Sequence, residues 1–131
     1  MLLHEDRLFP AEPAVRELAR SLYASVKDLP IVSPHGHTQA AWFADNKPFP
    51  DPATLFVQPD HYVYRMLYSQ GVSMDDLGIG QPRMEDPRKV WRIFASHYYL
   101  FRGTPTRLWL DFAFQSLFGL TEHPGEKNAD H

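Results

Sequence analysis

One short segment, Ile31 to Ser33, is the only part of this chain whose residues indicate a buried β-strand. It is apolar, and Pro30 directly before it prevents a helix from continuing into it. A lone strand constrains the fold strongly, because its backbone N–H and C=O groups have no ladder partner within the chain. We therefore expect this sequence to be the front part of a longer protein that supplies the neighbouring strands.

Helices account for most of the other signals. Residues 13–27 carry apolar side chains at helical spacing, with charged residues mostly off that stripe. Further helix starts are indicated at Asp51-Pro52, Asp86-Pro87 and Thr104-Pro105, because such residues suit the N-cap and the first turn. Glycines after the apolar stretches mark helix ends. The predicted helices span 13–27, 38–43, 53–57, about 60–71, about 86–102 and about 104–118.

Aromatic and basic side chains on these helices are assigned structural roles. The aromatic residues expected to pack in a core are Trp42, Phe43, Trp91, Phe94, Trp109, Phe112 and Phe114. The polar group around the Gly103 turn is assigned to structure or to contact between subunits, and consists of Tyr98, Tyr99, Arg102 and Arg107. The histidines that receive no role are His4, His97, His123 and His131.

Two histidines follow the predicted strand as His35-Gly36-His37. Side chains alternate along an extended backbone, so the two imidazoles point to the same side, as a shared divalent metal requires. Many metal-dependent (β/α)₈ barrel enzymes begin their site with this pattern at the end of the first strand. We predict that His35 and His37 are metal ligands, with zinc preferred because imidazole suits it. The alternative is a turn with two solvated imidazoles.

A second polar group, Asp60-His61-Tyr62, stands at the start of a predicted helix, with Arg65 one turn beyond His61 on the same face. A histidine next to a tyrosine can supply proton transfer and hydrogen bonding. The structural alternatives are a backbone hydrogen bond for His61, simple packing for Tyr62, and for Arg65 an ion pair with Asp60 or Glu85.

In their order along the chain these motifs resemble the N-terminal part of the uronate isomerase (glucuronate isomerase) family, a group of amidohydrolase-like barrels. The motifs are Asp28-Leu29-Pro30-Ile31, His35-x-His37, Asp60-His61-Tyr62-x-x-Arg65-Met66, Gly71-Val72, Gly103-x-Pro105 and Phe118-Gly119-Leu120. The resemblance runs from about Ala14 to Leu120 and covers about a quarter of a full enzyme. It implies an α/β fold in which residues 1–131 are the mostly helical front of a (β/α)₈ barrel. The first barrel strand would be 31–33, with a helical insertion over about 38–118 and the rest of the barrel outside the chain.

The resemblance also implies an activity, the interconversion of D-glucuronate with D-fructuronate and of D-galacturonate with D-tagaturonate. By position, His35 and His37 match the family's first two metal ligands, and His61 and Tyr62 match its substrate-site pair; Arg65 is added as a substrate-binding residue. The third metal ligand, a late aspartate, and the later substrate-binding arginines have no counterpart here. We therefore expect the 131-residue segment alone to be inactive.

The chain departs from the family pattern beside the metal histidines, where Ser33 replaces a common aspartate and Gly36 a common cysteine. Residues that contact the metal ligands influence which metal binds and how tightly. These two differences therefore affect the predicted identity of the metal more than the predicted class of reaction. Two other functions compete with the isomerase. A metal-dependent hydrolase of the same superfamily would share the histidine pair but not Asp60-His61-Tyr62, and a helical binding module would use the aromatic faces without catalysis.

Composition excludes several other classes of protein. A net charge of −3 provides no basic surface for nucleic acid, and the absence of cysteine rules out disulfides and thiolate metal sites. No stretch approaches the roughly 20 apolar residues of a membrane span, and the first residues lack the pattern of a signal peptide. We expect a cytoplasmic protein that binds a small hexuronate, binds no membrane and forms homo-oligomers.

Overall fold

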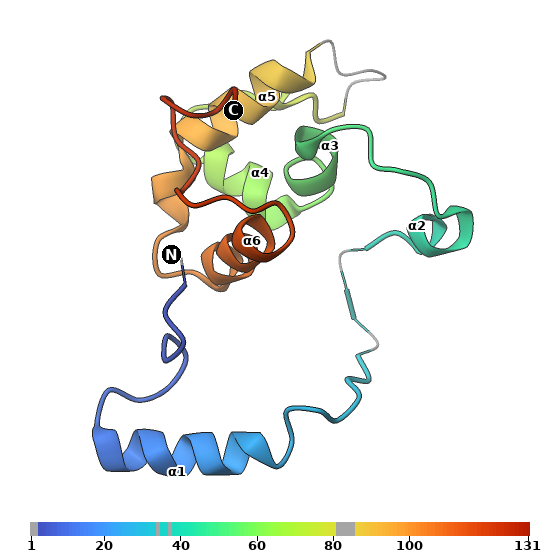
Figure 1. The fold of residues 1–131 in the computed structure, drawn as a ribbon. Coiled ribbons are helices and arrows are strands. Elements are labelled where there is room, and N and C mark those ends of the chain that lie inside the picture. The colour runs from blue at the N-terminus through green and yellow to red at the C-terminus, as the bar shows by residue number, and fades with distance from the viewer. Residues whose placement is uncertain (1–2, 34, 37, 81–85) are drawn as a thin grey trace.

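The computed structural model describes residues 3–33, 35–36, 38–80 and 86–131, and all regular structure within these ranges is helical (Figure 1). The elements are α1 (Pro13–Ala24), α2 (Ala40–Asp45), α3 (Pro52–Phe56), α4 (His61–Tyr68), the 3₁₀ helix η1 (Asp75–Leu77), α5 (Pro87–Ser96), the 3₁₀ helix η2 (Tyr98–Phe101) and α6 (Pro105–Ser116). Within the described ranges, no helix has the length and apolar character needed to cross a membrane.

Most helices begin where the cap and proline pattern predicts. Proline occupies the first turn of α1, α3, α5 and α6. In the three predicted cases the residue before it accepts hydrogen bonds from the backbone of the first turn: Asp51 from Thr54, Asp86 from Arg88, and Thr104 from Arg107. These starts depend on neighbouring residues only, which is why the sequence locates them. Helix α2 differs, since it begins at Ala40 after Gln39, which makes no side-chain cap.

The predicted continuous helix over about 86–102 is wrong, because the helix breaks at His97 into α5 and η2. The Nδ1 of His97 lies 2.8 Å from the carbonyl oxygen of Ile93, and Gly103 ends the following turn with φ 76°. In a 3₁₀ helix residues three apart share one side, so Tyr98 and Phe101 both reach the core.

Helices α3 to α6, with η1 and η2, form what we call the helical body. Its core is apolar and rich in aromatic rings: Ala53, Phe56, Val57, Val63, Leu67, Leu77, Val90, Phe94, Tyr98, Phe101, Leu110 and Phe114. The rings of Phe56 and Phe114 meet edge to face at 5.5 Å between centroids. The connection from α4 to η1 turns at Gly71, whose φ of 90° suits a residue without a Cβ.

The prediction of aromatic core residues is only partly confirmed. Phe94 and Phe114 are buried, and Trp91 packs against the core partly buried. Phe43, Trp109 and Phe112, however, are at least half exposed. Helix geometry explains this in α6. The side of the helix that faces the core carries Leu110 and Phe114. Trp109 and Phe112 lie on the opposite side.

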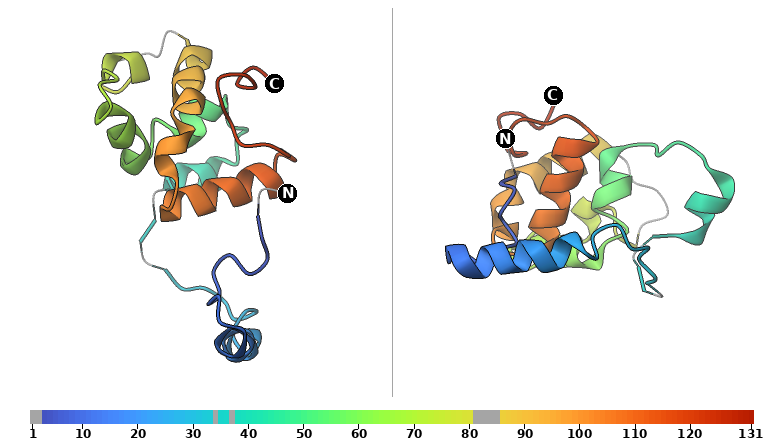
Figure 2. Two further views of the ribbon diagram at one scale, coloured as in Figure 1. Left: turned by 90° about the vertical axis from the view of Figure 1, so that its left-hand side faces the viewer. Right: turned by 60° about the horizontal axis from the view of Figure 1, so that its bottom comes forward.

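Helix α1 stands apart from the helical body, and none of its residues is buried (Figures 1 and 2). It is held by the N-terminal arm, residues 3–12. Arg20 donates through Nε to Oδ1 of Asp6 at 2.8 Å, and the Phe9 and Tyr23 rings meet edge to face at 5.9 Å. The arm therefore holds α1, while Leu3 at the start of the arm is buried and hydrogen-bonded to Gln115 of α6.

The predicted strand at Ile31–Ser33 is not confirmed, because the structure gives this segment no regular structure. It belongs to the connection between α1 and α2 (Figure 1), where Ile31 and Val32 are each 92% exposed. A strand forms only when a neighbouring strand pairs with its backbone, and the described ranges contain no other strand to do so. The described chain is thus helical, and it does not by itself show a barrel.

Candidate functional site

The start of α4 brings three of the predicted site residues together. Asp60 precedes the helix as its N-cap, and its Oδ1 accepts a hydrogen bond from the backbone N–H of Tyr62 at 2.8 Å. Farther along the helix, Val63 and Leu67 are fully buried in the core. The cap and these two anchors place His61 and Tyr62 on the first turn at the edge of the helical body.

The His61 and Tyr62 side chains lie against each other. Their ring centroids are 4.4 Å apart and the ring planes are tilted by 33°. Tyr62 is 60% exposed and His61 is half-buried. Arg65 is exposed one turn beyond His61. The site thus presents an imidazole, a phenol and a guanidinium on one short helix, a set that can exchange a proton, donate a hydrogen bond and bind an anion.

The predicted metal ligands lie on another part of the chain. His35 is exposed in the extended connection between α1 and α2, and its carbonyl oxygen accepts a hydrogen bond from the Ser33 hydroxyl at 2.9 Å. His37 lies outside the described residues. Imidazole is a suitable ligand for zinc, so the donor type fits. Among the described residues, however, no three histidine, aspartate or glutamate side chains gather to hold an ion. The assignment of His35 and His37 as metal ligands stays a prediction.

The helical body contains a buried polar network that was not predicted from the sequence. Asp111 accepts a hydrogen bond from the Tyr98 hydroxyl at 2.9 Å and from Nε of Arg107 at 2.8 Å, and Nδ1 of His123 lies 3.0 Å from its Oδ1. The guanidinium of Arg107 also lies over the Tyr98 ring at 4.1 Å. Burial, followed by the bond to Asp111, raises the pKa of the Tyr98 hydroxyl above its usual value.

The network confirms a structural role for Tyr98 and Arg107, whereas Tyr99 and Arg102 are exposed. The prediction that His123 has no role is wrong, because this residue connects the C-terminal segment to Asp111. The spacing of Arg107 and Asp111, four residues apart on a helix, was the one sequence signal that could have indicated their ion pair.

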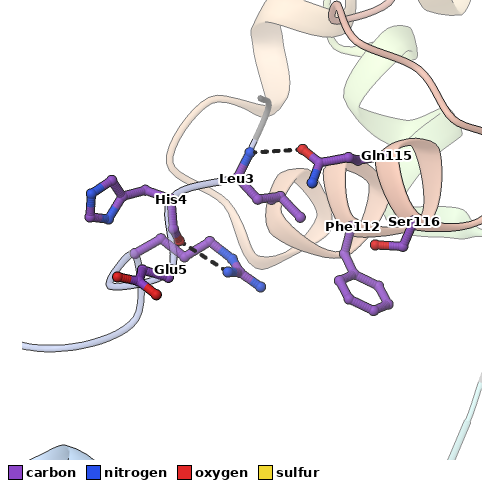
Figure 3. A pocket seen from close by; sticks show the side chains of 7 residues that line it. Leu3, His4, Glu5, Phe112, Gln115 and Ser116 are labelled. Carbon is purple, nitrogen blue, oxygen red and sulfur yellow. Dashed lines mark hydrogen bonds between the residues drawn. The ribbon is translucent and has the colours of Figure 1, made fainter.

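A hollow of about 620 Å³ opens between the N-terminal arm and α6, away from all the predicted site residues (Figure 3). The backbone N–H of Leu3 donates to Oε1 of Gln115 at 3.2 Å across it. Its lining consists of Leu3, His4, Glu5, Arg7, Phe112, Gln115 and Ser116. The start of α4, rather than this hollow, therefore remains the candidate catalytic site.

Comparison with known proteins places this chain in a family. The family model described as glucuronate isomerase matches residues 9–131. The uronate isomerase of Brucella canis is 58% identical over 134 residues, covering 99% of this chain and 29% of the relative. That of Caulobacter vibrioides is 60% identical over 131 residues, covering 97% of this chain and 27% of the relative.

Solved structures agree with the sequence comparison. The crystal structure of glucuronate isomerase from Caulobacter crescentus matches 98% of this chain with a TM-score of 0.89 and 58% identity. That of uronate isomerase from Thermotoga maritima matches 99% with a TM-score of 0.77 and 33% identity. Each match covers 27% of the solved chain.

This chain therefore spans less than a third of the length of the relatives it matches. The family model covers almost all of the chain, and the fold agrees with two solved members. The family resemblance predicted from the motifs is thus confirmed: the chain belongs to the glucuronate isomerase family.

Proposed function

We propose that this chain supplies part of the active site of a hexuronate isomerase, which interconverts D-glucuronate with D-fructuronate and D-galacturonate with D-tagaturonate. The observation that carries the proposal is the pair of adjacent His61 and Tyr62 rings, with centroids 4.4 Å apart and planes tilted by 33°, in a member of this family. A hydrolase would share the His35-x-His37 pattern but has no need for this second pair, which therefore favours the isomerase.

The chemistry requires a proton to move between C2 and C1 of the sugar through an enediolate. The His61 imidazole has a ring nitrogen that can accept that proton and return it. The Tyr62 hydroxyl beside it can donate a hydrogen bond to the oxygen that gains negative charge. Because the rings lie against each other, the two groups can act on neighbouring atoms of one substrate.

Two further residues support this pair. Arg65, exposed one turn along α4, can bind the substrate carboxylate with its guanidinium. The Asp60 cap bond to the Tyr62 backbone holds the first helical turn, and with it the directions in which both rings point. Asp60 is thus a positioning residue, whereas His61 and Tyr62 are the proposed catalytic residues.

A divalent ion, with zinc preferred, is proposed as the cofactor, held in part by the imidazoles of His35 and His37. When bound, it would offset the negative charge of the substrate carboxylate and polarise a neighbouring hydroxyl. The exposed backbone of Ile31–Ser33 is proposed to become the first strand of a (β/α)₈ barrel, since an extended apolar segment is available there for pairing. Cytoplasmic location and homo-oligomer formation stay predictions.

The test is a chimera in which residues 1–131 replace the matched region of the Caulobacter crescentus enzyme. We expect purified chimera to convert glucuronate to fructuronate. The Tyr62→Phe variant should lower kcat by about tenfold or more with little change in KM, as expected when a bond to the transition state is lost. Tyr68→Phe is the matched control, because Tyr68 lies on the same helix with 56% exposure against 60% for Tyr62, and it should leave kcat unchanged.

Two outcomes would contradict the proposal. A folded chimera that turns over no hexuronate would remove the assigned substrate class. An unchanged kcat for Tyr62→Phe would remove Tyr62 from the chemistry while leaving the family assignment intact.

A further inference from the structure

One residue, Gln58, joins three elements just before the candidate site. It lies between α3 and α4, shortly before the Asp60 cap. Its backbone N–H donates to the carbonyl oxygen of Ala53 in α3 at 3.1 Å. Its side-chain Nε2 donates to the carbonyl oxygens of Leu77 and Gly78, at the end of η1, at 3.2 Å and 3.4 Å. Gln58 therefore connects α3, η1 and the start of α4.

The two acceptors are carbonyl groups that η1 itself does not satisfy. The last carbonyl oxygens of a helix have no partner within it, because no further turn follows to supply N–H groups. Leu77 is fully buried, and Gly78 turns the chain away from η1 with φ 66°. A buried carbonyl that is left unpaired destabilises the fold. The Gln58 side chain is therefore held in this orientation.

Both elements that Gln58 contacts are supported by α5. Helix α5 packs against α3 and against η1. Lys89 of α5 also pairs with Asp76 of η1 at 2.6 Å, and the Asp76 backbone N–H donates to the Ser73 hydroxyl at 3.0 Å. The positions of α3 and η1 are thus set by the helical body, and the bonds of Gln58 fix the following segment relative to them.

The connection from Gln58 to the site is short and stiff. Only Pro59 separates Gln58 from Asp60. The proline ring fixes its own φ and also restricts the backbone of the residue before it. Asp60 in turn caps α4 through the Tyr62 N–H, and its carbonyl oxygen accepts the Val63 N–H at 3.0 Å. A shift of Gln58 therefore moves the first turn of α4, which carries the two rings of the site.

We propose that Gln58 is a positioning residue for the isomerase site. Through its bonds to the end of η1, it sets where the first turn of α4 places His61 and Tyr62. The expected effect on turnover rests on the proposed function. The placement of the turn is a property of the fold, so it can be measured without turnover.

The first experiment measures turnover in the chimera. Gln58→Met keeps the length of the side chain and removes its donors. We expect kcat to fall about fivefold or more with a smaller change in KM, because misplaced groups cost most in the transition state. Gln70→Met is the matched control, because Gln70 is exposed beyond the end of α4 and its Nε2 contacts the Ser69 hydroxyl at 3.4 Å. This control should leave kcat unchanged, and an equal kcat for both variants would overturn the proposal.

Gln58→Glu separates hydrogen-bond donation from packing. The new side chain has nearly the same shape, and it can donate to a carbonyl oxygen only while it is protonated. The two carbonyl oxygens that face it favour the protonated form and so raise its pKa. The kcat of this variant, relative to the unsubstituted chimera, should therefore rise about threefold or more as the pH falls from about 8 to about 5. A ratio that does not change with pH would overturn donation as the role of Gln58.

Hydrogen exchange in the 131-residue chain tests the placement without turnover. Gln58→Met should speed exchange of the Tyr62 and Val63 N–H groups about tenfold or more, because the first turn opens more often. The Leu67 N–H, farther along the same helix, should exchange at an unchanged rate.

Two exchange results would overturn the proposal. One is unchanged exchange at Tyr62 and Val63. The other is equal acceleration at Leu67, because Gln58 would then stabilise the fold as a whole without positioning the first turn. A chimera that turns over no hexuronate would count against the proposed function, and the exchange rates would still decide the placement.

Discussion

The hydroxyl of Tyr98 donates a 2.9 Å hydrogen bond to Oδ1 of Asp111 and so connects η2 with α6 inside the helical body. The other carboxylate oxygen binds Arg107 at 2.8 Å, and all three side chains are largely removed from solvent. One carboxylate thus satisfies a buried phenol and a buried cation, which could not both stay buried without it.

Asp111→Ala is therefore expected to lower the free energy of unfolding of this chain by about 2–4 kcal/mol, because it leaves the Tyr98 hydroxyl and the Arg107 charge unpaired. Urea unfolding followed by circular dichroism measures the change. Asp130→Ala is the control, since it removes the exposed ion pair with Arg92 and should leave the midpoint unchanged. Equal effects of the two substitutions would contradict a special role for the network.

The raised pKa of Tyr98 predicts a loss of stability in alkali. Burial and the Asp111 bond favour the protonated phenol in the folded state, so this stabilisation is complete below the unfolded pKa of about 10. Above that pH the unfolded chain releases a proton that the folded chain keeps, and the free energy of unfolding falls. Urea midpoints between about pH 8 and pH 11 measure the slope. Tyr98→Phe should make the fall of the urea midpoint with pH shallower. An unaltered slope would mean that other groups cause the loss of stability in alkali.

Asp60→Ala is expected to lower the free energy of unfolding by about 1 kcal/mol, because the first turn of α4 loses its N-cap acceptor. In the chimera it should also reduce kcat, since His61 and Tyr62 stand on that turn. Asp60→Asn keeps an acceptor for the Tyr62 N–H and should restore most of both quantities. If Asp60→Asn restores stability but not kcat, the Asp60 carboxylate contributes to turnover by more than positioning the first turn of α4.

Replacing both His35 and His37 with alanine in the chimera is expected to reduce bound zinc, because two of the proposed imidazole ligands disappear. Elemental analysis of dialysed protein measures the metal content directly. His4→Ala is the control, because His4 is exposed as His35 is, and it should leave that content unchanged. Unchanged zinc in the double variant would exclude these histidines as ligands.

Much of the candidate site could be predicted from the sequence, because the contacts that form it join residues close together in the chain. Asp60 caps α4 through a bond to a residue two positions away, and this alone places His61 and Tyr62 together on the first turn. The family followed from the spacing of such motifs along the chain. The metal histidines are a different case, since the structure describes His35 without His37 and no described set of three ligands surrounds it.

Features that depend on neighbouring residues could be predicted from the sequence: the starts of α3, α5 and α6, the turn at Gly103, and the adjacency of His61 and Tyr62. Which side of each helix meets the core was set by the packing of the helices in the folded chain. It exposed Phe112 while burying Phe114, broke the helix at His97, and gathered Tyr98, Arg107 and His123 around Asp111. It also gave Ile31–Ser33 no strand partner among the residues that the structure describes. The physical reason is that burial and strand pairing depend on contacts between distant residues, which local spacing does not encode.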